Sequence, residues 1–206
     1  MKTRILICRH GNTFDKGELV TRVGSRTDLK LSSSGIEQSK LLSKELSPFK
    51  SGFNFKLAFC SSLLRTKETG MYILSQGHKA KTLTILPFLK EIDYGPDENK
   101  SEEEVVNRIS KNALDLWDKK AIPPNGWIVN PHNIIQSWKL FFNDISNNEG
   151  DILVVTSNGI ARFIYESVHI VETDIVRKLN TAFFGVVEIK NNISTLKSWN
   201  INKLSK

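Results

Sequence analysis

The chain has 206 residues, 39% of them hydrophobic, so it is long enough to bury one hydrophobic core. Its formal net charge of +7 would suit nucleic acid, an acidic surface or a small phosphorylated ligand, but its basic residues are scattered and it carries neither a zinc finger nor an aromatic-rich RNA-binding motif. No stretch approaches the ~20 apolar residues of a membrane span, and Cys8 and Cys60 give neither a disulfide framework nor a zinc-binding spacing. We therefore expect a cytoplasmic protein with no nucleic-acid partner and no membrane partner.

Hydrophobic periodicity in the first half of the chain predicts strands that alternate with helices. The predicted elements are a strand at 4–8, a helix at 32–49, a strand at 56–62, a helix at 63–77 and a short strand with a loop at 83–93. Pro48 is expected to end the first of these helices, and Gly77 the second.

The same analysis of the second half predicts a helical stretch and then a return to alternation. The predicted elements are a helix at 101–119, a loop at 122–131, a helix at 133–145, a strand at 152–156, a helix at 159–169 and strands around 183–189 and 193–199. This order predicts an α/β three-layer sandwich, with a mainly parallel central sheet and helices on both faces. We expect one domain over residues 1–206, in which residues 96–150 form a small helical lid.

Three polar segments directly follow predicted strands, at residues 8–11, 61–65 and 157–159. Ligands of such sheets bind at the carboxyl ends of the strands, so these segments should converge on one site. In the first of them, Gly11 allows close approach of the backbone to a phosphate, Arg9 offers a bidentate hydrogen-bond donor, and His10 offers a nucleophilic nitrogen.

Five segments resemble, in the right order, the motifs of the histidine phosphatase superfamily, in its phosphoglycerate mutase-like branch. They are ILICRHGNTF, SRTDLKLSSSGIEQSKLL, CSSLLRTKET, LKEIDYG and VVTSNGIARF, and they extend from residue 5 to residue 163. The first contains the Arg-His-Gly motif that ends the family's first strand. The last stands where the family has a Ser-His-Gly turn.

The resemblance implies a role for each matching residue. His10 would take the phosphoryl group and become phosphohistidine, while Arg9 and Arg65 would hold the phosphoryl oxygens. Glu91 would protonate the leaving group and then activate water. The start of the helix at Asn158 and Gly159 would add phosphate-binding groups. No metal and no cofactor are implied, because arginines supply the positive charge.

The chain departs from the family at position 158, where a second histidine is normal. That histidine donates a hydrogen bond to the phosphoryl group and can carry a positive charge, whereas Asn158 can only donate. A slower enzyme and an inactive one are therefore both compatible with the sequence. Arg162, one turn further on, is a possible substitute for the charge, but we expect it to face solvent or an acidic neighbour.

A second departure lies in the loop after the Arg-His-Gly motif. The family often has an asparagine six residues past the histidine, where this chain has Lys16. Asn12, Lys16 and Arg22 are possible substrate-binding residues, although Lys16 and Arg22 fit solvated loop charges as well. Trp117, Trp127 and Trp138 are expected to pack in the interior rather than to line a substrate pocket.

The favoured function is a metal-independent phosphomonoesterase that acts on a small phosphorylated metabolite through a phosphohistidine. A phosphoglycerate mutase-type phosphoryl transfer is the second hypothesis, since a mutase needs a closed lid and residues 96–150 are modest in length for one. A non-catalytic phosphate-binding module is the third, because of Asn158. The sequence leaves open which phosphomonoester is bound and what the oligomeric state is.

Overall fold

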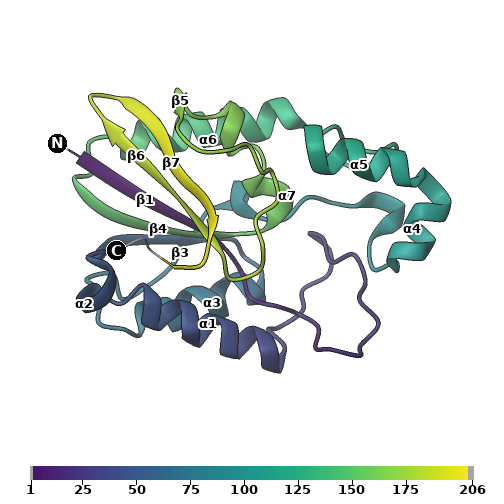
Figure 1. The fold of residues 1–206 in the computed structure, drawn as a ribbon, viewed down its shortest axis with the longest axis horizontal. Coiled ribbons are helices and arrows are strands. Elements are labelled where there is room, and N and C mark those ends of the chain that lie inside the picture. Colours follow the sequence, from purple (N-terminus) through teal and green to yellow (C-terminus); the bar gives the residue numbers. More distant parts are fainter. Residues whose placement is uncertain (1, 204–206) are drawn as a thin grey trace.

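The computed structural model describes residues 2–203, and within them seven strands form one sheet in the order β3-β2-β4-β1-β6-β7-β5 (Figure 1). The strands are β1 (Lys2–Arg9), β2 (Phe55–Cys60), β3 (Thr84–Ile85), β4 (Gly150–Thr156), β5 (Ile170–Val171), β6 (Phe184–Lys190) and β7 (Ile193–Ile201). The pairings of β6 with β1 and with β7 are antiparallel, and the others are parallel. The predicted mainly parallel sheet is confirmed.

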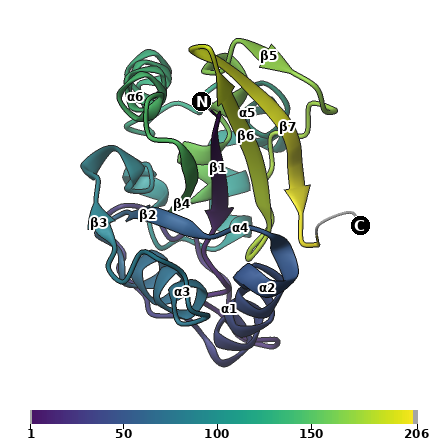
Figure 2. The same cartoon turned by 90° about the vertical axis from the view of Figure 1, so that its left-hand side faces the viewer.

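Helices cover both faces of this sheet, with α1 and α3 on one side and α5 and α6 on the other (Figure 2). The helices are α1 (Ser33–Glu45), α2 (Pro48–Ser51), α3 (Leu64–Leu74), α4 (Glu102–Ile109), α5 (Lys111–Lys120), α6 (Pro131–Ile145) and α7 (Asn158–Ala161). Short 3-10 turns lie at Pro87–Leu89, Gly95–Asp97 and Ile164–Glu166. The predicted three-layer α/β sandwich is therefore confirmed. No helix within residues 2–203 is both long enough and apolar enough to cross a membrane.

Strand β1 shows why its sequence is an unbroken apolar run. Successive side chains of a strand point to opposite faces. Ile5 and Ile7 pack into the core under α5 and α6, whereas Leu6 and Cys8 pack into the core under α1 and α3. All four side chains are fully buried. A strand with a helical layer on each face needs apolar residues at every position, as this one has.

Pro48 does not end the first helix as predicted. Helix α1 ends at Glu45, and Pro48 opens the short helix α2 instead. Proline is well suited to the first turn of a helix, where its missing N–H has no intrahelical partner to lose. Helix α3 ends at Leu74, shortly before Gly77, which has a left-handed backbone with φ of +87°.

The helix predicted at 101–119 is two helices, α4 and α5, that meet at Ser110. The backbone of Ser110 has φ 74° and ψ 155°, which turns the chain out of the helical path. Its N–H donates to Val106 O and ends α4, while its hydroxyl accepts from Ala113 N and caps α5. Serine is a strong N-cap residue, and the hydrophobic spacing alone did not reveal this break.

The helix predicted at 159–169 is also shorter than expected. Helix α7 covers only Asn158–Ala161, a 3-10 turn follows at Ile164–Glu166, and strand β5 begins at Ile170. Residues 159–165 are all buried, so this segment has no polar face. A segment that is buried on all sides lacks the one-sided apolar pattern from which the length of a helix is predicted.

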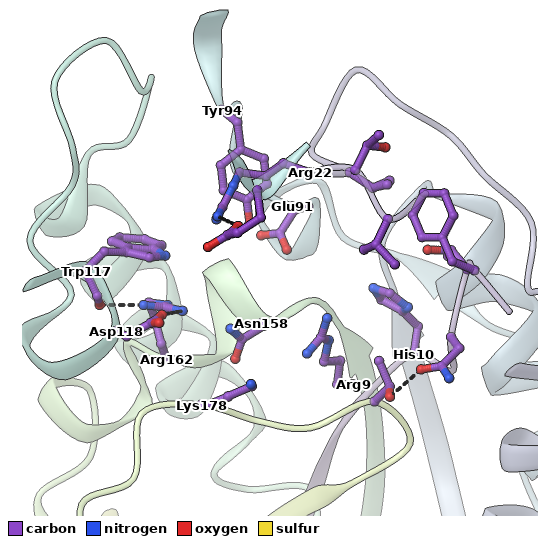
Figure 3. Close-up of a pocket in the computed structure, with 18 residues that line it drawn as sticks. Arg9, His10, Arg22, Glu91, Tyr94, Trp117, Asp118, Asn158, Arg162 and Lys178 are labelled. Atoms are coloured by element: carbon purple, nitrogen blue, oxygen red, sulfur yellow. Dashed lines mark hydrogen bonds and ion pairs between the residues drawn. The ribbon is translucent and has the colours of Figure 1, made fainter. Parts of the chain in front are cut away.

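The segment 96–150, which was predicted to form a lid, contributes helices both to the pocket and to the layer that covers the sheet. Helices α4 and α5 contribute Glu102, Trp117 and Asp118 to the pocket drawn in Figure 3, at the carboxyl ends of the central strands. Helix α6 packs over the sheet, where the ring of Phe141 meets that of Phe59 on β2 at 5.4 Å between centroids. Trp117, Trp127 and Trp138 are all buried, although Trp117 also borders the pocket.

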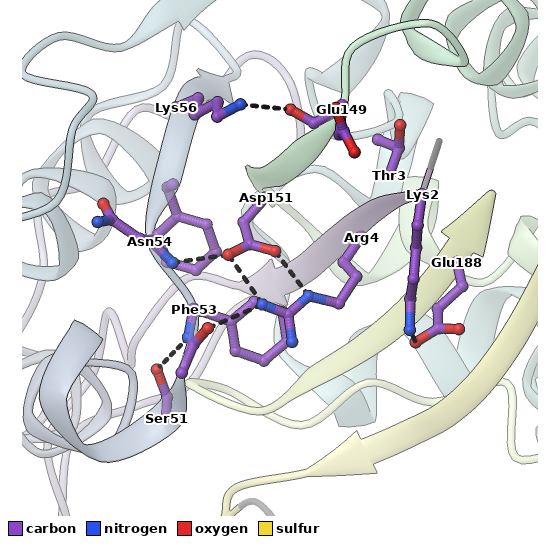
Figure 4. A network of polar contacts seen from close by, with 12 residues as sticks. Lys2, Thr3, Arg4, Ser51, Phe53, Asn54, Lys56, Glu149, Asp151 and Glu188 are labelled. Carbon is purple, nitrogen blue, oxygen red and sulfur yellow. Dashed lines mark hydrogen bonds and ion pairs between the residues drawn. The ribbon is translucent and has the colours of Figure 1, made fainter. Parts of the chain in front are cut away.

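At the opposite end of the sheet, Asp151 ties the first residues of three strands together (Figure 4). Its carboxylate accepts from Arg4 Nε at 2.6 Å, from Arg4 Nη2 at 2.9 Å and from the backbone N–H of Asn54 at 2.7 Å. Arg4 lies on β1, Asn54 precedes β2, and Asp151 lies on β4 between them. The Arg4 guanidinium also stacks on the ring of Phe53 at 4.2 Å.

We expect Asp151→Ala to lower the free energy of unfolding by about 2–3 kcal/mol, because it leaves Arg4 and a backbone N–H without their acceptor. Urea denaturation of the purified protein measures this. The matched control is Glu149→Ala. Glu149 is exposed and, within residues 2–203, accepts a hydrogen bond only through its backbone oxygen, so this substitution should change stability by less than about 0.5 kcal/mol. Equal effects of the two substitutions would contradict this account.

Candidate active site

Parallel pairing of β1 with β4 brings the predicted site segments together. Arg9 on β1 lies opposite Thr156 on β4, so the residues that follow these strands, His10 and Asn158, emerge at the same edge of the sheet. Arg65 approaches from the first turn of α3, and its Nε lies 3.2 Å from His10 Nε2. Glu91 follows the 3-10 turn at Pro87–Leu89. The sequence-predicted convergence of the strand ends is confirmed.

Most of these residues line a cavity of about 510 Å³ (Figure 3), but Arg65, whose Nε contacts His10, is not among the lining residues. The predicted site residues that line it are Arg9, His10, Asn12, Arg22, Glu91 and Asn158. Lys16 is exposed and lies outside the cavity, so its prediction as a substrate-binding residue is not supported by its position. The volume suits a small molecule, and both positive and negative side chains face it.

His10 is held as a neutral imidazole whose Nε2 accepts a hydrogen bond from Arg65 Nε at 3.2 Å. Its Nδ1 lies 2.7 Å from the carbonyl oxygen of Gly11, and a carbonyl can only accept, so Nδ1 carries the proton. Nε2 then has a lone pair. The ring is 6% exposed, and burial, together with the nearby charges of Arg65 and Arg9, lowers the pKa of His10 well below its ordinary value. This is the protonation state that a nitrogen nucleophile needs.

The two arginines flank His10 with fixed geometry. Arg65 is 1% exposed, and its Nη1 and Nη2 donate to Thr27 O at 2.9 Å and Gly24 O at 3.1 Å. Arg9 donates from Nη1 to Leu179 O at 3.0 Å, and its Nε has no hydrogen-bond partner among residues 2–203. Both guanidiniums are therefore oriented before any ligand binds.

Glu91 is 6% exposed and faces the same cavity. Burial raises the pKa of Glu91 above the ordinary value for a glutamate, although two backbone N–H groups act against this. Its Oε1 accepts from Ile92 N at 2.9 Å, and its Oε2 accepts from Gly159 N at 3.3 Å. The net effect is a raised pKa, so this carboxyl group keeps a proton to higher pH than an ordinary glutamate does.

The backbone N–H of Gly159, predicted to bind phosphate, donates to Glu91 in this structure. Its N–H points at Glu91 Oε2, and helix α7 has only four residues. A Cβ at position 159 would lie 2.2 Å from Glu91 Oε1, closer than real Cβ contacts come. Glycine at 159 is therefore what allows the carboxyl group to pack against this backbone.

Asn158 lines the cavity as predicted, and its amide is oriented by the loop that follows β5. Its Oδ1 accepts from Leu179 N at 2.8 Å, which leaves both protons of Nδ2 for the cavity (Figure 3). In this position Asn158 offers a hydrogen-bond donor close to Arg9 and His10 but no charge.

Asn12 and Arg22 line the cavity, but their side chains already contact other residues of the protein. Asn12 Oδ1 accepts from Thr181 Oγ1 at 2.6 Å, and its Nδ2 donates to Ser34 Oγ at 3.3 Å. The guanidinium of Arg22 pairs with Glu102 and lies over the rings of Tyr94 and Trp127. These contacts give both residues a role in shaping the walls of the cavity.

Arg162 is the largest difference from the sequence prediction. It was expected to face solvent or an acidic neighbour; it has an acidic neighbour, Asp118, but it is 1% exposed and borders the cavity rather than solvent. Among residues 2–203, Asp118 is the one acidic side chain that pairs with it, at 3.5 Å. The signal in the sequence is weak: Arg162 follows Asn158 by four residues, which places the two on the same side of one helical turn. Lys178 and Thr181 also line the cavity, and no motif singled them out.

Within residues 2–203, no three His, Cys, Asp or Glu side chains are grouped so that they could hold a metal ion.

The site combines an α/β fold with a strand-end histidine and nearby arginines, and the comparison with known families identifies the family. The family model of the histidine phosphatase superfamily (branch 1) matches residues 5–202. The chain therefore belongs to the histidine phosphatase superfamily.

Individual relatives include both mutases and phosphatases. A 2,3-bisphosphoglycerate-dependent phosphoglycerate mutase of Treponema denticola is 30% identical over 116 residues, which are 55% of this chain and only 45% of that mutase. A phosphoglycerate mutase structure from Bacillus anthracis str. Sterne has a TM-score of 0.78 at 18% identity and covers 98% of this chain and 93% of its own. An α-ribazole phosphatase structure from Shigella flexneri has a TM-score of 0.71 at 20% identity and covers 98% of both chains. At these identities the solved structures show a shared fold.

Proposed function

We propose that the protein is a phosphomonoesterase that hydrolyses a small phosphorylated metabolite through a phosphohistidine at His10. The observation that carries this proposal is that a neutral imidazole and a carboxyl group with a raised pKa face one cavity. His10 Nε2 carries the lone pair of the imidazole and accepts from Arg65 Nε, while burial raises the pKa of Glu91. A nucleophile and an acid that face the same cavity are what cleavage of a phosphate ester requires.

In the first step, His10 Nε2 attacks phosphorus and the bond from phosphorus to the ester oxygen breaks. The proton of Glu91 passes to that leaving oxygen. Arg65 Nε, 3.2 Å from His10 Nε2, then has a phosphoryl oxygen within reach as the nitrogen–phosphorus bond forms. Arg9 offers its unpartnered Nε to the same group, so both arginines stabilise the charge that develops there.

In the second step, the Glu91 carboxylate takes a proton from water as the water oxygen attacks phosphorus. The nitrogen–phosphorus bond breaks and inorganic phosphate leaves, which restores neutral His10 and protonated Glu91. Because fixed arginines provide the positive charge, we propose that turnover needs no metal ion and persists in EDTA.

A mutase is the second candidate, and the 30% identity to a phosphoglycerate mutase over 116 residues favours it. Both functions use the same phosphohistidine. They differ in whether water or a bound organic hydroxyl accepts the phosphoryl group.

The test is release of inorganic phosphate from a panel of phosphomonoesters, with and without EDTA, and with phosphodiesters as negative controls. Isomerisation of 3-phosphoglycerate is followed in parallel. We expect His10-dependent phosphate release in EDTA. Isomerisation without release would establish the mutase instead. Binding of inorganic phosphate without turnover of any ester would leave the non-catalytic binding module.

We expect Asn158→His to raise kcat by about tenfold or more, because histidine would add a positive charge where Asn158 offers only a hydrogen bond. Steady-state kinetics on the best ester of the panel measure this, and Asn158→Ala, which removes the donor, should lower kcat. An unchanged kcat in Asn158→His would show that another cation already supplies the charge.

A further inference from the structure

Arg162 is a buried charge with incomplete pairing at the edge of the cavity. Its guanidinium lies 3.9 Å above the indole of Trp117, and its Nη1 donates to Trp117 O at 2.5 Å. These two contacts fix the plane and one end of the group. The residue is 1% exposed, so water does little to solvate it.

The opposite edge of the guanidinium, formed by Nε and Nη2, lacks good hydrogen-bond acceptors. Nε has no hydrogen-bond partner within the described part of the chain, and Nη2 reaches Asp118 Oδ1 only at 3.5 Å. The Asp118 side chain is 63% exposed, which makes it a weak and replaceable partner. The Nε and Nη2 edge of an arginine is a fork that matches the two oxygens of a carboxylate.

This edge belongs to the same cavity as His10 but lies beyond Asn158. The backbone N–H of Arg162 donates to Asn158 O at 3.2 Å, so the two residues are one turn apart on α7. Figure 3 shows the order His10, Arg9, Asn158 and Arg162 along the cavity, with Lys178 below Asn158. A molecule that places its phosphoryl group at His10 would therefore extend its other end toward Arg162.

We infer that Arg162, Trp117 and Lys178 form a distal subsite for a carboxylate on the leaving group of the substrate. The inference rests on the proposed function, because it names the substrate class of that same cavity: phosphomonoesters that carry a carboxylate. A single negative charge fits better than a second phosphate, since Asp118 and Glu102 also face this cavity and would repel a dianion.

The experiment compares two ligands that differ in one group. 3-Phosphoglycerate carries a carboxylate where glycerol 1-phosphate carries a hydroxymethyl group. kcat/KM for phosphate release is measured for both in the wild-type protein, in Arg162→Gln, and in Arg26→Gln, an exposed arginine outside the cavity. Binding of both ligands is measured by calorimetry in His10→Ala and in the double variant with Arg162→Gln.

We expect the wild-type protein to prefer 3-phosphoglycerate by about tenfold or more, and Arg162→Gln to remove this preference by weakening the carboxylate ligand alone. Arg26→Gln should keep it. Equal losses on both ligands in Arg162→Gln, or no preference in the wild-type protein, would overturn the distal subsite. If neither ester is hydrolysed, the calorimetric preference in His10→Ala still decides the matter, and only the phosphatase proposal fails.

Discussion

Replacing His10 by alanine is expected to lower kcat for phosphate release by ~10⁴-fold or more, because the variant lacks the nitrogen that takes the phosphoryl group. It should also abolish covalent phosphorylation of the protein. Rapid quench with a ³²P-labelled ester, followed by separation of the denatured protein under alkaline conditions, measures both the rate and the label. This effect is the largest that the site geometry implies.

The matched control is His132→Ala, because His132 is an exposed histidine on α6, outside the cavity. This variant should keep the rate and the label of the wild-type protein. Label that persists in His10→Ala would place the nucleophile elsewhere and would refute the phosphohistidine mechanism as stated.

Glu91→Gln is expected to lower kcat/KM for alkyl phosphates by about 10²–10⁴-fold, since glutamine has no proton to give to the leaving oxygen. The loss should be much smaller for p-nitrophenyl phosphate, because p-nitrophenolate leaves without protonation. kcat/KM is the parameter to measure, as it reports the steps up to phosphohistidine formation. Equal losses for the two kinds of ester would contradict an acid role for Glu91.

The pH dependence of the rate gives an independent test of the role of Glu91. Burial raises the pKa of Glu91 and lowers that of His10, so the active combination, protonated Glu91 with neutral His10, occupies the interval between the two. The rate should fall at high pH as Glu91 loses its proton and at low pH as His10 gains one. Glu91→Gln should remove the high-pH limb, whereas Glu103→Gln, on an exposed glutamate outside the cavity, should keep both limbs.

The strands were predictable because their apolar runs are set by burial on both faces. The run around Ile5 is apolar at every position for that reason, and the order of strands and helices then fixed the fold class. Helix ends were less predictable. The break at Ser110 depends on a backbone conformation that serine adopts only when its neighbours stabilise it, and hydrophobic spacing does not contain that information.

Within the site, residues that belong to a strand end or to a motif could be predicted, and the others could not. His10 and Asn158 follow adjacent parallel strands, so topology alone brings them together. Arg162 looked like a surface charge because an arginine among apolar residues is normally exposed. Its burial depends on a platform, the indole and carbonyl of Trp117, that comes from a helix 45 residues earlier.

The central position of β1 also bears on how the protein folds during synthesis. The strand neighbours on its two sides are β4 and β6, and their pairings join residue 3 to residue 150 and residue 2 to residue 190. During synthesis the apolar strand β1 therefore has no partner strand until β4, which starts at Gly150, has also been made. Such distant pairings fold slowly and leave time for aggregation. The cavity, whose lining residues run from Arg9 to Thr181, exists only after this long-range pairing is complete.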